Sequence, residues 1–178
     1  NLRRWVTGAT QPLRVYGSSE IINVTEVINL AYKNDEDYRV DHHGEEFVPP
    51  KNRPMTAIVH SPTDEPQLIF EDENIKVESF LVDHFPVKQA IGFRIFFGEK
   101  VIIISGDTEI TDNVFSLVDG ADVLIHDGMI KEHVSFLAGV AKENNVSRME
   151  IAFTDILDYH ADVIEIKKNL ENKDLGWL

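Results

Sequence analysis

Acidic and imidazole side chains follow several apolar segments of this sequence, each at the point where the segment ends. These positions are His84 after residues 75–82, Asp107 after residues 101–104, and His126 with Asp127 after residues 122–125. Such groups can bind a metal ion or transfer a proton. Because open α/β sheets bind their ligands at the carboxyl ends of strands, the repetition predicts a functional site at one edge of a sheet.

Each of these residues also has an ordinary structural explanation. A single histidine such as His84 is more often a surface or core residue than a ligand. Asp107 lies beside Gly106, and an aspartate there is typical of a turn. His126 and Asp127 could be solvated in the loop before Gly128. Their recurrence at successive strand ends is what favours the functional interpretation.

Two weaker candidates lie downstream. His133 comes immediately before a helix expected to begin near residue 134, where a solvated histidine is also common. Asp155 follows residues 150–153, a segment predicted to be a strand. It would therefore occupy the same position relative to the sheet as His84 and Asp107, although turn formation explains an aspartate there equally well.

Hydrophobic periodicity predicts the elements that position these residues. Strands are expected at residues 13–16, 55–59, 67–70, 75–82, 92–97, 101–104, 123–125 and 150–153, and helices at residues 21–31, 111–118, 134–144 and 161–170. The polar, proline-broken residues 34–54 are predicted to form a long loop. A run of strands followed by alternating helices and strands predicts an α/β (α+β) fold, with mixed sheets and helices on the outer faces, in a single domain over residues 1–178.

Composition narrows the classes of partner. The formal net charge is −14, which argues against nucleic acid because nonspecific binding depends on Lys and Arg. The chain has no cysteine, so any metal must be bound by His, Asp and Glu. No apolar run is long enough for a membrane helix, so we expect a soluble chain without a membrane partner. The compartment is not fixed by these features, although the cytoplasm is favoured.

The order of these segments resembles the metallo-β-lactamase superfamily, and within it the ribonuclease Z-like and arylsulfatase-like hydrolases. The resemblance rests on residues 12–17 (PLRVYG), 82–84 (VDH), 91–94 (IGFR), 105–108 (SGDT) and 121–127 (ADVLIHD). It implies an αββα sandwich and a metal-dependent hydrolase. Such an enzyme would cleave a phosphodiester, sulfate ester or related ester by means of a metal-bound hydroxide.

The resemblance also implies roles for individual residues. His84, Asp107 and Asp155 would bind zinc, with Asp107 bridging two ions, while His126, Asp127 and His133 would assist proton transfer at the leaving group. Two features depart from the family pattern. Its His-x-His-x-Asp-His motif has no counterpart, since the first histidine is His42, and Asp155 stands where the family has its last histidine ligand.

These departures leave two principal hypotheses open. In the first, the chain is the C-terminal portion of a zinc-dependent hydrolase, incomplete at its N-terminus, that acts on a small-molecule ester. In the second, it is a degenerate or truncated member that serves as a non-enzymatic binding or structural module. A third, a doubly wound domain that binds a phosphate ligand at residues 105–108, lacks a glycine-rich fingerprint. A truncated sheet would expose an edge that a homodimer could cover.

Overall fold

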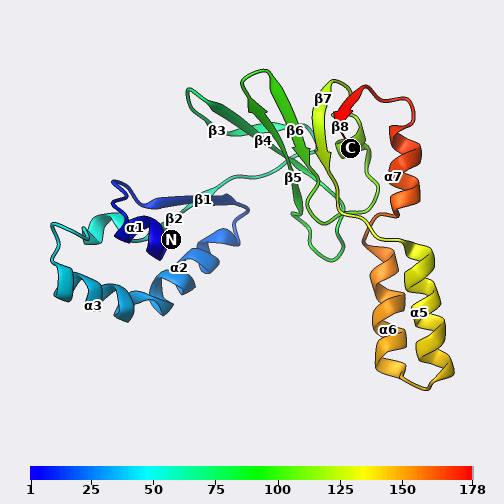
Figure 1. Ribbon diagram of the computed structural model, residues 1–178, viewed down its shortest axis with the longest axis horizontal. Coiled ribbons are helices and arrows are strands. Elements are labelled where there is room, and N and C mark those ends of the chain that lie inside the picture. Colours follow the sequence, from blue (N-terminus) through cyan, green and yellow to red (C-terminus); the bar gives the residue numbers. More distant parts are fainter. Residues whose placement is uncertain (178) are drawn as a thin grey trace. The chain divides into compact units, whose positions relative to one another are not determined.

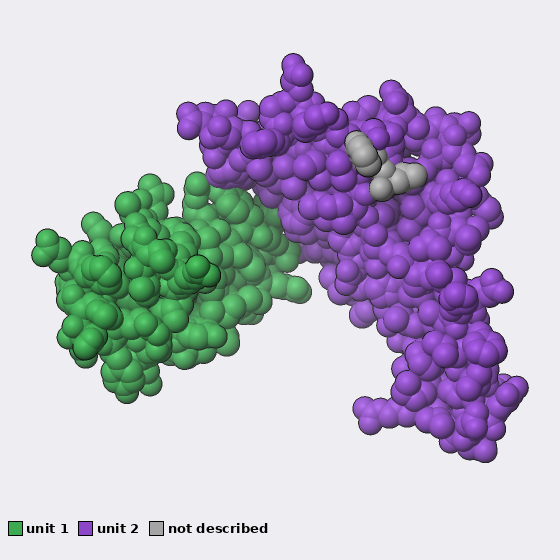
Figure 2. Space-filling model, viewed as in Figure 1, with its two compact units in different colours: residues 1–61 green, residues 62–178 purple. Residues whose placement is uncertain are grey.

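The computed structural model describes residues 1–177, which fold into compact units. Unit 1 comprises residues 1–61 and unit 2 comprises residues 62–178 (Figure 2). The single domain over residues 1–178 stays a prediction. No helix within residues 1–177 combines the length and apolar character needed to cross a membrane.

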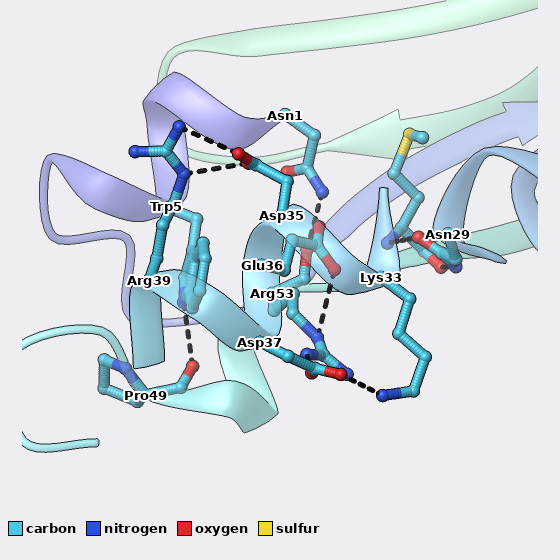
Figure 3. Close-up of polar contacts among 11 residues, drawn as sticks. Asn1, Trp5, Asn29, Lys33, Asp35, Glu36, Asp37, Arg39, Pro49 and Arg53 are labelled. Carbon is cyan, nitrogen blue, oxygen red and sulfur yellow. Dashed lines mark hydrogen bonds and ion pairs between the residues drawn. The ribbon is translucent and has the colours of Figure 1, made fainter. Parts of the chain in front are cut away.

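Unit 1 is a small parallel β-ribbon with helices. Its elements are α1 (Leu2–Val6), β1 (Leu13–Gly17), α2 (Ile21–Ala31), α3 (Lys33–His43), the 3₁₀ helix η1 (Pro50–Asn52) and β2 (Met55–Val59) (Figure 1). Strands β1 and β2 pair in parallel, with Leu13 opposite Met55. The buried Trp5 donates its indole N–H to Pro49 O at 2.9 Å, and the Asn29 side chain bonds both main-chain polar atoms of Met55 at 2.8 Å (Figure 3).

The loop predicted over residues 34–54 is wrong for its first half, which is the helix α3. Ion pairs between residues four apart support this polar helix: Lys33 contacts Asp37, and Arg39 Nε lies 2.9 Å from Asp35 Oδ2 (Figure 3). The helix ends at Gly44, whose φ of 83° terminates it. The apolar periodicity used for the prediction cannot detect a helix whose stabilising contacts are between charges.

Unit 2 is built on a mixed sheet. Its elements are β3 (Gln67–Glu71), β4 (Ile75–Leu81), β5 (Ile91–Phe97), β6 (Lys100–Ile104), α4 (Asp112–Phe115), β7 (Ala121–Ile125), α5 (Lys131–Glu143), α6 (Ser147–Asp155), the 3₁₀ helix η2 (Ile156–Asp158), α7 (Val163–Leu170) and β8 (Leu175–Trp177) (Figure 1). The six strands are ordered β3-β4-β5-β6-β7-β8. Pairing is antiparallel from β3 to β6 and parallel from β6 to β8. The predicted α/β class with a mixed sheet is therefore confirmed, while the αββα layering stays a prediction.

The core of unit 2 forms where β4 and β6 pack with α4. Phe80, Ile103, Val114 and Val118 are fully buried and belong to one hydrophobic cluster. Thr111 caps the N-terminus of α4 by accepting a hydrogen bond from Asn113 N. The helix ends at Phe115, so it is shorter than the segment 111–118 predicted. Burial of such side chains stabilises the fold by roughly 1.5–3 kcal/mol each, which anchors the strands that carry the candidate residues.

The strand predicted over residues 150–153 is wrong, because these residues lie in α6. Helices α5 and α6 form an antiparallel hairpin (Figure 1). The chain turns between them at Asn145, which has a φ of 58°. A short apolar run is compatible with either a strand or a helix, and here packing on α5 decides in favour of a helix. Asp155 consequently lies at the end of a helix rather than at a strand end.

Candidate active site

The carboxyl ends of β4, β6 and β7 lie at the same edge of the unit 2 sheet. Strand β5 is antiparallel to both β4 and β6, so β4 and β6 run in the same direction, and β7 is parallel to β6. The segments that follow these strands contain His84, Asp107 and Asp127 respectively. The edge predicted from the sequence is therefore present.

A buried threonine connects the segments after β4 and β6. Asp83 N donates to Thr108 Oγ1 at 3.2 Å, and Glu109 N donates to Asp83 O at 2.9 Å. The Thr108 side chain is completely buried. These contacts fix the main chain immediately before His84.

A buried serine connects the segments after β6 and β7. Ser105 N donates to Ile125 O at 2.9 Å, and Asp127 N donates to Ser105 Oγ at 2.9 Å. Between Ser105 and Thr108 the chain passes through Gly106, which has a φ of 69°. The three strand ends are thus joined by hydrogen bonds from short polar side chains.

The segment between η2 and α7 is hydrogen-bonded to these strand ends. Ala161 N donates to Thr108 O at 3.0 Å, and Met129 N donates to Ala161 O at 2.9 Å. Val163 N in turn donates to Met129 O at 2.9 Å. These bonds bring Tyr159 and His160, which are remote in sequence, to the edge of the sheet.

Two histidines meet at this edge with fixed ring orientations. His84 Nδ1 lies 3.0 Å from Tyr159 O, and because a carbonyl only accepts, Nδ1 carries the proton. His160 Nδ1 lies 2.5 Å from Asp127 Oδ2, which also accepts from Thr108 N at 3.3 Å. The ring centroids of His84 and His160 are 5.2 Å apart. A neutral imidazole that donates through Nδ1 has a lone pair on Nε2, available to a proton or a ligand.

A cavity of about 410 Å³ adjoins His84. It is lined by Val82, Asp83, His84, Phe85, Pro86, Val87, Lys88, Glu109 and Asp158. Phe85, one of the lining residues, is 84% exposed. Lys88 contributes a positive charge to the lining of the cavity. The cavity therefore combines one cation and one imidazole with three carboxyl groups, those of Asp83, Glu109 and Asp158.

The structure brings together only some of the residues predicted for the site. His84 and Asp127 meet through His160. Asp107 is exposed in the segment after β6. His133 is exposed in the first turn of α5, and Asp155 is exposed at the end of α6, where it accepts from the Tyr159 hydroxyl at 3.4 Å. Their metal-binding and catalytic roles stay predictions.

His126 is packed into unit 2. Its ring stacks on Phe115 with centroids 5.4 Å apart, and its Nδ1 lies 2.5 Å from Asp127 O. Nε2 is buried and has no hydrogen-bond partner among the described residues. Burial lowers the pKa of His126, against the opposing effect of its hydrogen bond to Asp127 O. Partial burial therefore favours the neutral form of this imidazole.

His160 was not predicted as a site residue. It lies in the short connection between η2 and α7, two residues before Asp162, whose side chain caps α7. Its place beside Asp127 results from the pairing of Met129 with Asp162, a long-range contact. Neither periodicity nor local motif could predict that pairing.

The zinc expected from the resemblance does not have a sufficient ligand set in the described part of the chain. No group of three or more His, Asp or Glu side chains in residues 1–177 is arranged to hold a metal ion. A catalytic zinc site needs about three protein ligands. His84, Asp107 and Asp155 therefore do not fit such a site as they are arranged here.

No family model matches the chain, but the sequence is similar to several ribonuclease Z proteins. Ribonuclease Z of Mycobacterium sp. (strain KMS) is 27% identical over 179 residues, which is 99% of this chain and 56% of that protein. A putative ribonuclease Z of Mycobacterium tuberculosis (strain CDC 1551 / Oshkosh) is 29% identical over 177 residues, covering 98% of this chain and 71% of that protein. The predicted resemblance to ribonuclease Z proteins is thus confirmed.

Solved structures of metallo-β-lactamase-fold proteins were also found. Human tRNase Z, short form, aligns with a TM-score of 0.43 and 17% identity, over 88% of this chain and 63% of that one. Zn²⁺-bound PqqB from Methylobacterium extorquens aligns with a TM-score of 0.41 and 14% identity, over 72% and 38%. The chain spans only 56% of the length of the first mycobacterial relatives.

The expected partner, a small-molecule ester with nucleic acid unlikely, is contradicted by the comparisons. The relatives that align with nearly the whole chain are ribonucleases, whose substrates are nucleic acids. The net charge of −14 had argued against nucleic acid as a partner. Net charge governs nonspecific association over the whole surface. A bound substrate interacts mainly with the charges and side chains at its own binding site.

Proposed function

We propose that the protein containing this chain hydrolyses a phosphodiester bond in RNA. The observation that carries the proposal is the pair of oriented imidazoles, His84 and His160, at the carboxyl edge of the sheet. The similarity to ribonuclease Z over 98–99% of the chain supports RNA as the substrate class. Phosphodiester cleavage requires groups that contact phosphate oxygens and move protons, and imidazoles do both.

The chemistry of the described residues is limited to binding, orientation and proton transfer. Thr108 and Ser105 hold the strand ends at a fixed spacing, and Tyr159 O and Asp127 orient the two rings. Lys88 would contact a phosphate in the adjoining cavity, against the repulsion of three carboxylates that line the same cavity. Residues 1–177 do not supply a three-ligand group for a metal ion.

The test is cleavage of an end-labelled RNA, with and without added Zn²⁺ or Mn²⁺. The protein should cleave the RNA, and the His84→Ala/His160→Ala double variant should lose about 10²-fold or more in rate, since general acid–base groups contribute 10²–10⁴-fold. His42→Ala is the matched control, because His42 is exposed in unit 1 and should leave the rate unchanged. The proposal would be refuted if the unaltered protein cleaved no RNA either without added metal or with Zn²⁺ or Mn²⁺ present.

A second candidate is a non-catalytic RNA-binding module. It is favoured by the same lack of a three-ligand group within residues 1–177. The two candidates give different results with one labelled RNA. A module without catalytic activity would bind it, as measured by fluorescence anisotropy, and release it intact.

A further inference from the structure

Phe85 is 84% exposed, more than any other large apolar residue in the described part of the chain. It directly follows His84 of the candidate site and lines the cavity of about 410 Å³ beside it. We propose that this cavity binds one nucleobase of the RNA substrate, stacked on the Phe85 ring, and that its carboxylates select a base carrying an amino group. This inference rests on the proposed function and names the part of the substrate that the cavity recognises.

The backbone around Phe85 is held in a tight turn. Val87 N donates to His84 O at 2.7 Å, which closes a turn with Phe85 at its second position. The residue before the turn, Asp83, is fixed by the hydroxyl of the buried Thr108. The turn thus presents the ring from a defined place at the end of β4. A ligand that binds to a group on a fixed backbone loses less free energy to the ordering of that group.

The ring of Phe85 is available for stacking. It pairs with no other aromatic ring within residues 1–177. Burial of a phenyl ring stabilises a fold, and a ring as exposed as this one gains little of that stabilisation. Every nucleobase has a flat π face, and proteins bind unpaired RNA bases by stacking them on exposed aromatic side chains. A base stacked on Phe85 would lie next to His84, beside the bond that the proposed function cleaves.

The charges that line the cavity favour a neutral group over an anion. Asp83, Glu109 and Asp158 contribute carboxyl groups, and Lys88 contributes one ammonium. At similar distances three carboxylates repel a phosphate more strongly than one ammonium attracts it. A nucleobase carries no charge, so it can enter the cavity while the flanking phosphates stay away from the carboxylates. The volume of about 410 Å³ is in the range of pockets that hold small ligands.

The same carboxylates distinguish one base from another. None of the three takes part through its side chain in a hydrogen bond or ion pair within residues 1–177, so each can accept a proton donor. Glu109 is half-buried, whereas Asp83 and Asp158 are exposed, so water competes least at Glu109. A carboxylate accepts a hydrogen bond from the amino group of cytosine, but it repels the carbonyl oxygen that uracil has in that place. The cavity should therefore prefer cytosine to uracil.

The experiment measures the binding of labelled oligocytidylate and oligouridylate of equal length by fluorescence anisotropy. EDTA is present, and gel electrophoresis checks that each oligomer stays intact. We expect the unaltered chain to bind oligocytidylate about tenfold more tightly than oligouridylate. Phe85→Ala should bind oligocytidylate about 5- to 150-fold more weakly, which corresponds to the loss of one base stacked on an aromatic ring. Phe85→Tyr retains the ring and should bind within about threefold of the unaltered chain.

Phe97 provides the matched control for loss of an exposed ring. It is 60% exposed and pairs with Ile75 at the start of β4, at the opposite end of the sheet from the cavity. Phe97→Ala should therefore leave both affinities unchanged. Glu109→Gln tests the selection among bases, because an amide can donate to a carbonyl oxygen as well as accept from an amino group. This variant should reduce the preference for oligocytidylate to less than about threefold.

The outcomes separate this inference from the proposed function. If Phe85→Ala binds oligocytidylate as tightly as the unaltered chain, or no more weakly than Phe97→Ala does, the stacking site is overturned. Equal affinity of the unaltered chain for the two oligomers would overturn the selection of a base with an amino group. If the unaltered chain binds neither oligomer, the whole inference is overturned. In each of these cases the RNA cleavage assay decides the proposed function independently, because it scores broken phosphodiester bonds rather than affinity.

Discussion

Thr108 contacts both main-chain polar atoms of Asp83, with its Oγ1 3.2 Å from the nitrogen and 3.1 Å from the oxygen. Its own N–H donates to Asp127 Oδ2 at 3.3 Å. One buried residue thus fixes the backbone before His84 and also the carboxylate that orients His160. Thr108 therefore helps to position both imidazoles of the candidate site, those of His84 and His160.

Replacing Thr108 with Val tests this support. The change leaves Asp83 N without its buried partner, so it should lower the free energy of unfolding by about 1–3 kcal/mol. Thr108→Ser keeps the hydroxyl and loses only a methyl group. This variant should therefore lower the free energy of unfolding by about 1 kcal/mol. Hydrogen exchange of the β4 and β6 amides measures the effect within unit 2. Equal exchange rates in the Val variant and the unaltered chain would contradict the prediction.

The sequence predicted that the candidate site lies at one edge of the sheet, but it did not predict all of the residues that lie there. His84, Asp107 and Asp127 could be placed on it because each follows an apolar strand, and strand direction is a local property. His160 could not, because its position depends on backbone bonds between Ala161, Thr108 and Met129. Long-range pairing of this kind leaves no periodic signal in the sequence.

Gly106 provides a second test of the segment after β6. With a φ of 69°, it occupies the left-handed region, and a Cβ placed on it would lie 2.7 Å from Ile91 O. Gly98 has a similar φ of 57°, with nothing within 4 Å of the corresponding position. In urea unfolding, Gly98→Ala should therefore cost about 1 kcal/mol, from backbone strain alone. Gly106→Ala should cost on the order of 3 kcal/mol, because a clash with main chain is added. Similar losses in both variants would mean that the segment moves to accommodate the methyl group.

The fold shows the same division between local and long-range information. Strands such as β4 and β6 were predictable because apolar residues recur along them and turns bound them. Helix α3 was missed because it is stabilised by charge pairs such as Arg39 with Asp35, and α6 was mistaken for a strand because only α5 beside it favours a helix. Pairing of strands and packing of helices are decided by contacts that a single sequence does not display.

The partly buried imidazole of His126 should make the free energy of unfolding depend on pH. Burial lowers the pKa of His126 in the folded chain. In the unfolded chain the imidazole binds a proton near pH 6.5, whereas in the folded chain it does so only at a lower pH. The stabilising contribution is therefore present above about pH 6.5 and is lost as the pH falls from there toward the lowered folded value. Urea unfolding between pH 7.5 and 5 measures this loss.

His126→Phe is the control for this pH dependence, since it retains a ring against Phe115 and cannot titrate. Burial also lowers the pKa of His60 in unit 1, so some dependence on pH should remain in the variant. The difference between the two slopes isolates His126. Parallel pH profiles for the variant and the unaltered chain would show that His126 does not resist protonation in the fold.

Glu78 is 7% exposed and lies opposite Arg94 in the sheet. Burial alone would raise the pKa of Glu78, but hydrogen bonds from Lys76 and Arg94 outweigh it and lower the pKa. Arg94 Nε donates to Glu78 Oε2 at 2.8 Å, so Arg94→Leu leaves a buried charge with only Lys76 beside it. This variant should lose on the order of 2–3 kcal/mol in urea unfolding, because an uncompensated buried charge is strongly destabilising.

The double variant Glu78→Leu/Arg94→Leu should recover most of that stability, because it removes the buried charge together with its partner. Lys76→Met is the matched single change on the exposed side of the same carboxylate. The Lys76 side chain is 39% exposed, so its loss should cost less than about 1 kcal/mol. If the double variant is no more stable than Arg94→Leu alone, the arginine contributes through packing of its stem rather than by compensating Glu78.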